Sequence, residues 1–520
     1  MAAGIRVHAT ISRIFEFTQH SPASGESRVW TTTSVTATAD TPGPSAAPAS
    51  TGRGRYNRQR PAWVIITVLV LVEIISAFET SMVYAAIPTF IREFHSDAAT
   101  VGWAVTAFLL VAAASAAVCG RLGDMFGRER VLVVLLAAAA VGSFISAIGD
   151  SIGSIIVGRA IQGVAGAILP LCIGLAREHL PAKQVPVAIS IISGSAVAAG
   201  SASLLVAGVM LDHASWHMIF VVAAVYAVLA LLLVLFVLPW RPPTGTTQRV
   251  DYLGTIAFAP AIAAVLLGIN KSGAWGWTDI KTLGLIIGGL VVLALWVLWE
   301  LRVTDPIVNV RLFTDRKVAL TMVATLAIAV GPMGISTMII PMILQSPTTA
   351  PFGLGISATN AGWLSFIGSM FGFVCTPLSG RISRAVGARA SMLLGTALFT
   401  IGSAMLIIFH DSVAGMVAMI ITVSVATAFA YTALPNLIVE AVPESNTSEA
   451  TGTNSVLRTG GQGIGTSIAT MLLTSSAVSA GSAAPTVGGL NTVATMMVVL
   501  GLVTFGFTLL IRRGSVFKDA

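Results

Sequence analysis

Two acidic residues, Glu73 and Glu79, fall within the first long apolar stretch of this sequence. Arg159 is expected to be the only buried cation placed firmly within such a stretch. Inside a bilayer, an acidic side chain costs on the order of 3 kcal/mol even on the lenient insertion scale. Such an acid is expected to face a cavity or a polar partner, and alternating exposure would let it exchange protons. Glu79 is therefore the first candidate for a proton-coupling residue and Glu73 the second. The alternative is a structural glutamate held by hydrogen bonds.

The spacing of the two acids separates them around a helix. Six residues turn an α-helix by about 600°, so the side chains lie some 120° apart and share no face. Glu73 lines up with Tyr84, whereas Glu79 lines up with Ser76. Glu79 lies roughly 13 Å before Pro88, and Glu73 lies nearer the middle of the stretch.

The composition requires a membrane around these acids. Of the 520 residues, 55% are hydrophobic and 10% are charged, whereas a soluble domain carries roughly a quarter charged residues. The sequence therefore predicts an all-α polytopic membrane protein without a separate soluble domain. The net charge of +7 is assigned to the membrane face and not to nucleic acid. Three scattered cysteines in apolar stretches indicate neither a disulfide framework nor a zinc site.

A membrane-spanning helix needs about 20 mostly apolar residues. We predict fourteen spans, centred near residues 63–87, 101–120, 131–149, 152–175, 186–210, 217–238, 252–270, 282–301, 318–344, 359–379, 390–408, 413–435, 450–473 and 491–511. Of the 29 Lys and Arg residues, only Arg92, Lys271 and Lys281 fall in loops on the side opposite the termini. Positive charge accumulates on the cytoplasmic side, so both termini are expected in the cytoplasm and the protein in the cell membrane.

The chain repeats itself at an offset of 260 residues. The matching positions are Gly102-Trp103 with Gly362-Trp363, Gly120-Arg121 with Gly380-Arg381, and Gly127 with Gly387. Such repeats are typical of secondary transporters, which bind substrate between the repeats. We predict a cytoplasmic tail (1–60), a six-helix half (61–240), two inserted helices (241–304), a second six-helix half (305–512) and a cytoplasmic C-terminal tail (513–520).

The loop "GRLGDMFGRER" resembles the loop signature of the major facilitator superfamily. The matching positions are Gly120, Leu122, Asp124, Gly127, Arg128 and Arg130. The glycines allow a tight turn and close helix approach, while the Asp can meet a helix N-terminus or an Arg. The second copy has Arg384 in place of the Asp, so it is expected to keep only a packing and topology role.

Further stretches are similar to the fourteen-span drug:proton antiporters of the EmrB/QacA type, over residues 61–512. "FETSMVYAAIP" contains Glu79 and Tyr84, "GRAIQG" contains Arg159 and Gln162, and "VDYLG" opens the first inserted helix. The resemblance implies two six-helix halves plus two inserted helices. It also implies proton-coupled export of lipophilic or cationic small molecules by alternating access. A proton gradient would be the energy source, with no cofactor, and the partners would be substrate, protons and membrane lipid around a functional monomer.

The fifth predicted span departs from that family pattern. Small residues recur at Ser195, Ala199, Ser203, Ala207 and Gly208, but Leu204 stands where the family has Pro. The small-residue stripe favours close helix packing, whereas the kink attributed to Pro is expected to be lost.

In the superfamily, the loop Asp is thought to clamp the two halves together at their cytoplasmic ends. We expect Asp124 to lie near residues 444–458 when the carrier faces outward, because the segment "ESNTSEATG" offers the N-terminus of the thirteenth span. Glu449 already occupies that end. An Arg from the 121–130 loop is therefore expected to bridge the two acids.

Several alternatives remain open or are disfavoured. A carrier of a specific metabolite or lipid stays the second hypothesis, and a membrane enzyme or non-transporting sensor the third. Asp212, His213 and His217 have helical metal spacing, but they lie at a span boundary, and no metal site is predicted. "GGQGIG" (460–465) lies within an apolar span without a preceding strand, so it indicates helix packing and no nucleotide site.

Overall fold

The computed structural model describes residues 60–512, apart from 97, 241–250, 304–305, 307, 351 and 476–485. The two predicted tails, Arg60 excepted, and the segment 241–250 lie outside the described residues. Within the described part the chain is helical and contains no strand. Thirteen helical segments are long and apolar enough to cross a membrane. The chain is an all-α polytopic membrane protein, as predicted.

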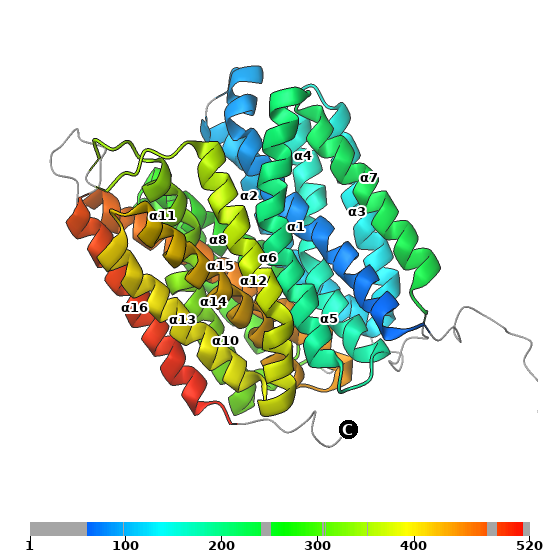
Figure 1. Ribbon diagram of the computed structural model, residues 1–520. Helices are drawn as coiled ribbons and strands as arrows, with labels where there is room; N and C mark the ends of the chain where they lie inside the picture. Colours follow the sequence, from blue (N-terminus) through cyan, green and yellow to red (C-terminus); the bar gives the residue numbers. More distant parts are fainter. Residues whose placement is uncertain are drawn as a thin grey trace, which may run out of the picture. The chain divides into compact units, whose positions relative to one another are not determined.

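The N-terminal half contains six of these segments. They comprise α1 (Ala62–Glu93), α2 (Ala98–Phe126), α3 (Arg128–Ile148), α4 (Ile152–Gln162) continued by η2 (Gly163–Ala167) and α5 (Ile168–His179), α6 (Val185–His213) and α7 (His217–Val237). Their apolar side chains make up most of two buried clusters, with α1 contributing to both and Val439 of α14 joining one of them. Figure 1 shows this half in blue, cyan and green-cyan.

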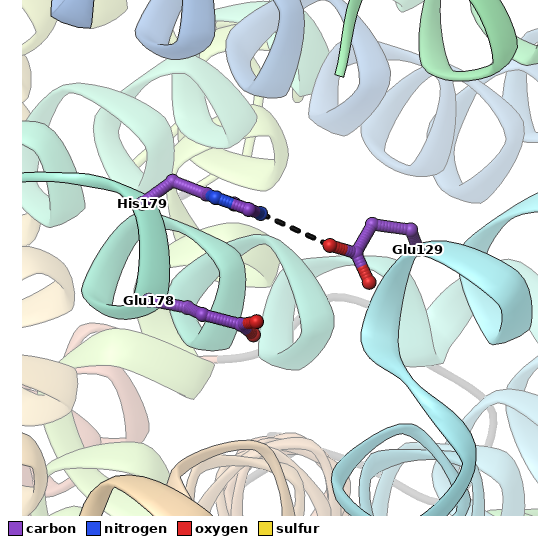
Figure 2. A group of neighbouring side chains, drawn as sticks. All are labelled: Glu129, Glu178 and His179. Carbon is purple, nitrogen blue, oxygen red and sulfur yellow. Dashed lines mark hydrogen bonds and ion pairs between the residues drawn. The ribbon is translucent and has the colours of Figure 1, made fainter. Parts of the chain in front are cut away.

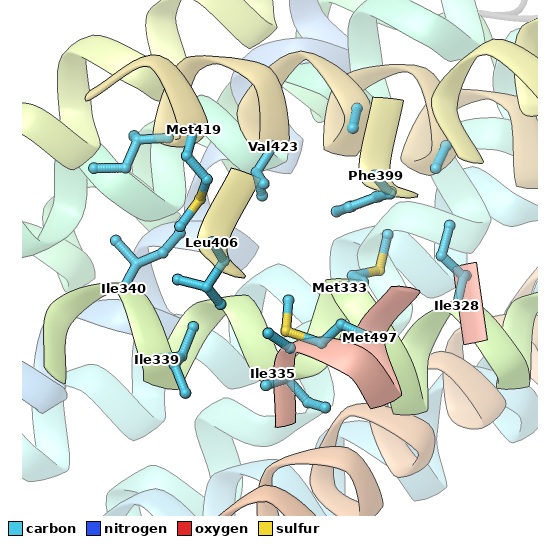
Figure 3. Packing of buried hydrophobic residues seen from close by; sticks show 14 of the residues in the cluster. Ile328, Met333, Ile335, Ile339, Ile340, Phe399, Leu406, Met419, Val423 and Met497 are labelled. Carbon is cyan, nitrogen blue, oxygen red and sulfur yellow. The ribbon is translucent and has the colours of Figure 1, made fainter. Parts of the chain in front are cut away.

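The C-terminal half begins with η3 (Val310–Thr314), followed by α10 (Arg316–Ile328), η4 (Ala329–Met333) and α11 (Gly334–Gln345). Then come α12 (Ala358–Val386), α13 (Ala388–Phe409), α14 (Val413–Val439), η5 (Glu444–Asn446), α15 (Thr447–Ser475) and α16 (Val487–Leu510). One large apolar cluster holds this half together. Figure 3 shows part of it, with Phe399 of α13, Met419 of α14 and Met497 of α16 around the side chains of η4 and α11.

The helix α15 contains the predicted span that is not among the thirteen apolar segments. Its 29 residues are rich in Gly, Ser and Thr, which lowers its hydropathy. It packs against α2, α5, α8 and α10, so protein surrounds its polar positions. A helix of this composition is stable in a membrane when neighbouring helices cover it.

The inserted pair, α8 (Tyr252–Trp275) and α9 (Ile280–Glu300), packs on itself and on both halves. Within the pair, the rings of Phe258 and Trp296 lie 4.7 Å apart. Toward α2, the Lys271 ammonium lies 4.9 Å from the ring centroid of Trp103. Toward α15, Ser467 Oγ donates to the backbone O of Ile269 at 3.2 Å. The pair therefore bridges α2 and α15.

The internal repeat corresponds to one structural unit present twice. Helices α2 and α12 both have 29 residues and are followed after a single glycine by α3 and α13. Those glycines, Gly127 and Gly387, have φ values of 101° and 97°. Only glycine adopts such conformations without strain. The repeated glycines thus mark equivalent sharp turns in the two halves.

Candidate functional site

A hydrogen-bonded chain ends at the carboxyl of Glu79, which is fully buried inside the N-terminal half. Gln162 Nε2 of α4 donates to Ser143 Oγ of α3 at 2.6 Å, and Ser143 Oγ donates to Glu79 Oε1 at 3.0 Å. A longer contact of 3.5 Å joins Gln162 Nε2 directly to the same carboxyl oxygen. Glu79 Oε2 is buried and has no hydrogen-bond partner among the described residues. Oε1 of this carboxyl is therefore fixed by hydrogen bonds, whereas Oε2 can accept another hydrogen bond or bind a proton.

Arg159 lies beside this chain and is also fully buried. Its Nη1 donates to the backbone O of Glu79 at 2.7 Å and to Gln162 Oε1 at 3.0 Å, and its guanidinium lies 4.1 Å from the ring centroid of Phe108. Its Nη2 is buried without a partner among the described residues. The structure records no ion pair between Arg159 and the Glu79 carboxyl, although each charge acts on the other. Glu79 Oε2 and Arg159 Nη2 are thus a potential acceptor and a potential donor for each other.

Glycines set the distances within this cluster. A Cβ at Gly142 of α3 would lie 2.6 Å from the backbone O of Gly158, so α3 and α4 touch backbone to backbone there. This close approach places Ser143 against Gln162. Directly after Gln162, the helix tightens into η2, where a Cβ at Gly163 would lie 2.7 Å from the backbone O of Phe108 on α2. The polar side chains therefore sit where three helices meet at short range.

The two acids of α1 have different neighbouring residues, as their 120° separation predicted. Glu73 is 2% exposed, and the charge that acts on it is Arg458 of α15. Tyr84 is 45% exposed and lies close enough to Arg159 for an electrostatic interaction. The view that Arg159 is the one buried cation firmly within a span was wrong. Arg458 is 7% exposed, and its guanidinium lies 4.1 Å from the ring centroid of Tyr431 on α14.

A second polar cluster joins the two halves at the end of α2. Asp124 Oδ2 accepts the backbone N–H of Glu449 in the first turn of α15 at 3.0 Å. Arg128 Nε donates to Asp124 Oδ1 at 2.8 Å and to Ser448 Oγ at 3.0 Å, and its Nη2 donates to the backbone O of Glu444 at 2.6 Å. The structure places Asp124 in contact with the segment 444–458, near which the sequence led us to expect it.

The two acids at this end have separate arginines. Arg121 Nη1 lies 3.2 Å from Glu449 Oε2, while Arg128 pairs with Asp124. The expected single Arg bridge is therefore replaced by two ion pairs. Glu449 Oε1 also accepts the backbone N–H of Asn309. Of the other loop residues, Leu122 packs against the apolar cluster beneath α8, and Arg130 is exposed.

Two glycines show where the halves touch. A Cβ at Gly120 of α2 would lie 2.5 Å from the backbone O of Ser448, and one at Gly380 of α12 would lie 2.6 Å from Cα of Val187 on α6. Toward the other ends of α2, α12 and α6, a Cβ would meet nothing within 4 Å at positions 102, 362 and 208. The halves are closed at the Asp124 end.

The small-residue stripe on α6 is buried except at its last member. Ser195, Ala199, Ser203 and Ala207 are buried, with Ala199 packing near Ala77 of α1 and Ala207 near Met82. Gly208 was wrongly assigned to packing, because a Cβ there would meet nothing within 4 Å. The close approach missed by the sequence is Gly194, which packs on Thr376 of α12. The helix runs unbroken through Leu204, as the missing Pro predicted.

Three potential metal donors gather near the Asp124 end: Glu129, Glu178 and His179, with donor atoms within 4.8 Å of one another. Figure 2 shows His179 of α5 reaching Glu129 at the start of α3, with Nε2 and Oε1 3.0 Å apart. Glu178 pairs with Arg128 at 2.9 Å. Each of the three donors thus already has a protein partner, and Glu178 extends the contact network of Arg128. The other histidine pair, His213 and His217, lies at the opposite end, and the Asp212 side chain is outside the described residues.

The sequence profile of the Major Facilitator Superfamily matches residues 69–466 and 321–515. The chain belongs to the Major Facilitator Superfamily. Within the superfamily, a tetracenomycin C resistance and export protein of Streptomyces glaucescens is 30% identical over 257 residues, which cover 49% of this chain and 48% of that protein. A uridine/deoxyuridine transporter of Lactococcus lactis is 26% identical over 425 residues, which cover 77% of this chain and 85% of that protein. The chain thus spans about half the length of the first relative.

Solved structures support the same superfamily fold. The human organic anion transporter MFSD10 (TETRAN) superposes with a TM-score of 0.61 and 14% identity, covering 86% of this chain and all of that one. At this identity the likeness shows the fold alone. The relatives are transporters, and their names describe different substrates.

Proposed function

We propose that this chain is a proton-coupled exporter of lipophilic or cationic small molecules, a fourteen-span antiporter of the EmrB/QacA type. The observation that supports it most is the buried Glu79 carboxyl beside Arg159, because Glu79 Oε2 and Arg159 Nη2 both lack a hydrogen-bond partner among the described residues. A charge in such surroundings is costly unless a proton or an opposite charge balances it. A carboxyl that alternates between these two partners is a proton carrier.

The proton step uses the two unpartnered atoms. When a proton is bound, Glu79 is neutral, and Arg159 stays on the backbone O of Glu79 and on Gln162. When the proton leaves, the carboxylate can accept from Nη2 of Arg159, while Ser143 continues to hold Oε1. Substrate binding and release would be tied to these states by the opening and closing of the Asp124 end. The cycle needs no cofactor besides the proton gradient.

The setting of this activity follows from the positive-inside rule and the repeat. We place the protein in the cell membrane as a monomer, surrounded by lipid, with the Asp124 end and both termini in the cytoplasm. The two halves (61–240 and 305–512) rotate relative to each other about the substrate, and the inserted helices (241–304) move with the helices that they contact. The closed Asp124 end then corresponds to an outward-facing carrier.

The second candidate is a carrier of a specific metabolite. The similarity to a uridine/deoxyuridine transporter favours it, because that match covers more of the chain than the match to the export protein. A polar solute of that kind would need several fixed hydrogen bonds in the cavity, whereas lipophilic molecules need few.

Purified full-length protein in proteoliposomes tests the proposal. A pH-sensitive dye inside the vesicles reports proton flux while a panel of dyes, lipophilic cations and nucleosides is supplied under an imposed pH gradient. We expect lipophilic compounds to accumulate against their gradient together with counter-flow of protons. Transport that ignores the pH gradient would contradict antiport. Proton flux that is coupled to nucleosides and to no other compound of the panel would favour the metabolite carrier.

A further inference from the structure

A third polar cluster lies between the halves and uses residues that the proton step leaves aside. Glu73 is on α1 of the N-terminal half, whereas Tyr431 and Arg458 are on α14 and α15 of the C-terminal half. The Tyr431 side chain packs against a small apolar cluster that contains Ala77 of α1 and Ala196 of α6. The ring thus reaches across the interface and carries the Arg458 guanidinium on its face, 4.1 Å from the centroid.

This cluster lies near mid-membrane depth. Glu73 is eleven residues from the start of α1 at Ala62, and Arg458 is eleven residues from the start of α15 at Thr447. Both are therefore about 16 Å along their helices from the closed end, about half of a hydrocarbon core of roughly 30 Å. Carriers built from repeats bind their substrates at this depth, between the repeats.

The polar groups of this cluster have hydrogen-bonding capacity that the described residues leave unused. Glu73 is 2% exposed, and its Oε2 has no hydrogen-bond partner among the described residues. Arg458 makes no hydrogen bond or ion pair within the part of the chain that the structure describes, although it is 7% exposed. A buried acceptor that is left unsatisfied is costly. The acceptor Glu73 of the N-terminal half and the donor Arg458 of the C-terminal half thus lie at the same interface between the halves.

Charge and hydrogen bonding together select a ligand. The Glu73 carboxylate accepts only, and the Arg458 guanidinium donates only. Their charges balance, so a ligand with net charge would leave one of them uncompensated in a medium of low dielectric constant. The complement is a neutral group that accepts from Arg458 and donates to Glu73. A primary amide has both functions in one plane.

We propose that Glu73, Arg458 and Tyr431 form the substrate subsite for a neutral, planar group with adjacent hydrogen-bond donor and acceptor, of which an amide is the simplest. The inference rests on the proposed function, because it treats the interface between the halves as the transport pathway. It narrows the substrates to aromatic or lipophilic molecules that carry such a group. Net charge of either sign is disfavoured at this subsite, because it would leave Glu73 or Arg458 uncompensated.

Three fluorescent isosteres test the charge rule: 2-naphthamide (neutral), 2-naphthamidine (cationic) and 2-naphthoate (anionic). Binding to purified full-length protein in detergent is measured at neutral pH without any gradient. We expect 2-naphthamide to bind about ten-fold more tightly than either charged probe, which corresponds to one charge-assisted hydrogen bond. Tightest binding of 2-naphthamidine, or no preference among the three, would overturn the proposal.

Charge variants sharpen the test. Glu73→Gln leaves Arg458 unbalanced, so the preference should move to 2-naphthoate, whereas Arg458→Gln should move it to 2-naphthamidine. Glu93→Gln is the matched control, because it makes the same substitution at an exposed position of the same helix and should leave the ranking unchanged. If Arg458→Gln does not fold, Arg458→Lys should keep the wild-type ranking. An unchanged ranking in Glu73→Gln sinks the subsite.

The failure of this inference is distinguishable from failure of the proposed function. Binding is measured without a proton gradient, so loss of antiport in vesicles would leave the probe ranking intact. Proton-coupled transport by a protein that shows no ranking would remove the subsite alone.

Discussion

Asp124 accepts the backbone N–H of Glu449 at 3.0 Å, and by this bond an acid of the N-terminal half stands at the first turn of α15 in the C-terminal half. The first N–H groups of a helix have no partner within the helix, and they carry the positive end of its dipole. Arg177 of α5 adds to the same end, donating to the backbone O of Val442 and to Thr447 Oγ1, each at 2.8 Å. The contact joins the halves and must break when they separate there.

Asp124→Asn should therefore favour opening at this end. The amide keeps an acceptor but loses the charge that interacts with the helix dipole, which is worth about 0.3–2 kcal/mol. The open population should rise about two- to thirty-fold. A cysteine at the buried position 116 of α2, introduced without the three native cysteines, reports opening through its rate of maleimide labelling. Asp279→Asn, a partly buried cap at the start of α9, is the control, and equal labelling in the two variants would contradict the gate.

Gly120→Ala tests the same contact by shape. The new Cβ would lie 2.5 Å from the backbone O of Ser448, so the closed end can form only if the helices move apart. We expect turnover to fall at least several-fold while the helical content by circular dichroism stays unchanged. Gly102→Ala, on the same helix where a Cβ meets nothing within 4 Å, should keep wild-type transport. Equal transport by the two variants would show that the close approach is dispensable.

Glu79→Gln should uncouple transport from protons. The amide fills the same volume and can still accept from Ser143, but it cannot titrate. Proton counter-flow in vesicles should disappear, while exchange of substrate down its own gradient persists. Glu300→Gln, a buried acid on the inserted helix α9, should leave proton flux intact. Uphill accumulation of substrate by Glu79→Gln at the wild-type rate would transfer the coupling role to another group.

Gly127→Ala and Gly387→Ala should each lower stability. Their φ values of 101° and 97° are strained for any residue with a Cβ, at a cost of about 1–3 kcal/mol. We expect a lower midpoint of thermal unfolding in detergent for both variants. Gly506→Ala, within α16 where a Cβ meets nothing within 4 Å, should match or slightly exceed wild type, since Ala favours helix. Unchanged midpoints for both turn variants would argue against strain at the turns.

Features carried by local sequence were predictable. The repeated glycines of the 260-residue repeat occupy matching turns, because a sharp helix–helix junction needs a glycine wherever it occurs. The position of Asp124 at α15 followed from a motif together with a segment rich in helix caps. The separation of Glu73 from Glu79 followed from helix rotation alone.

Contacts between distant helices were not predictable in the same way. Rotation fixes which residues share a face of one helix, but it does not say which helix covers that face. Ser143 and Arg458 carried no periodic signal that would have linked them to Glu79 and Glu73. Gly208 directly follows the stripe, yet a Cβ there would meet nothing within 4 Å, although Ala207 beside it is buried. The small residue that matters is Gly194, on a face the stripe did not mark.

The inserted pair has a consequence for molecules that arrive from the lipid. A carrier made of two halves has two seams open to the bilayer, here α2 with α15 and α6 with α12. The first seam is covered by α8, which holds Trp103 of α2 and Ser467 of α15, while much of α9 forms the outer surface. The second is closed by direct contacts between α6 and α12, such as that between Ser201 and Ser369. A lipophilic molecule that enters there would have to separate these two helices, so the side chains along their contact would set the width of its entrance.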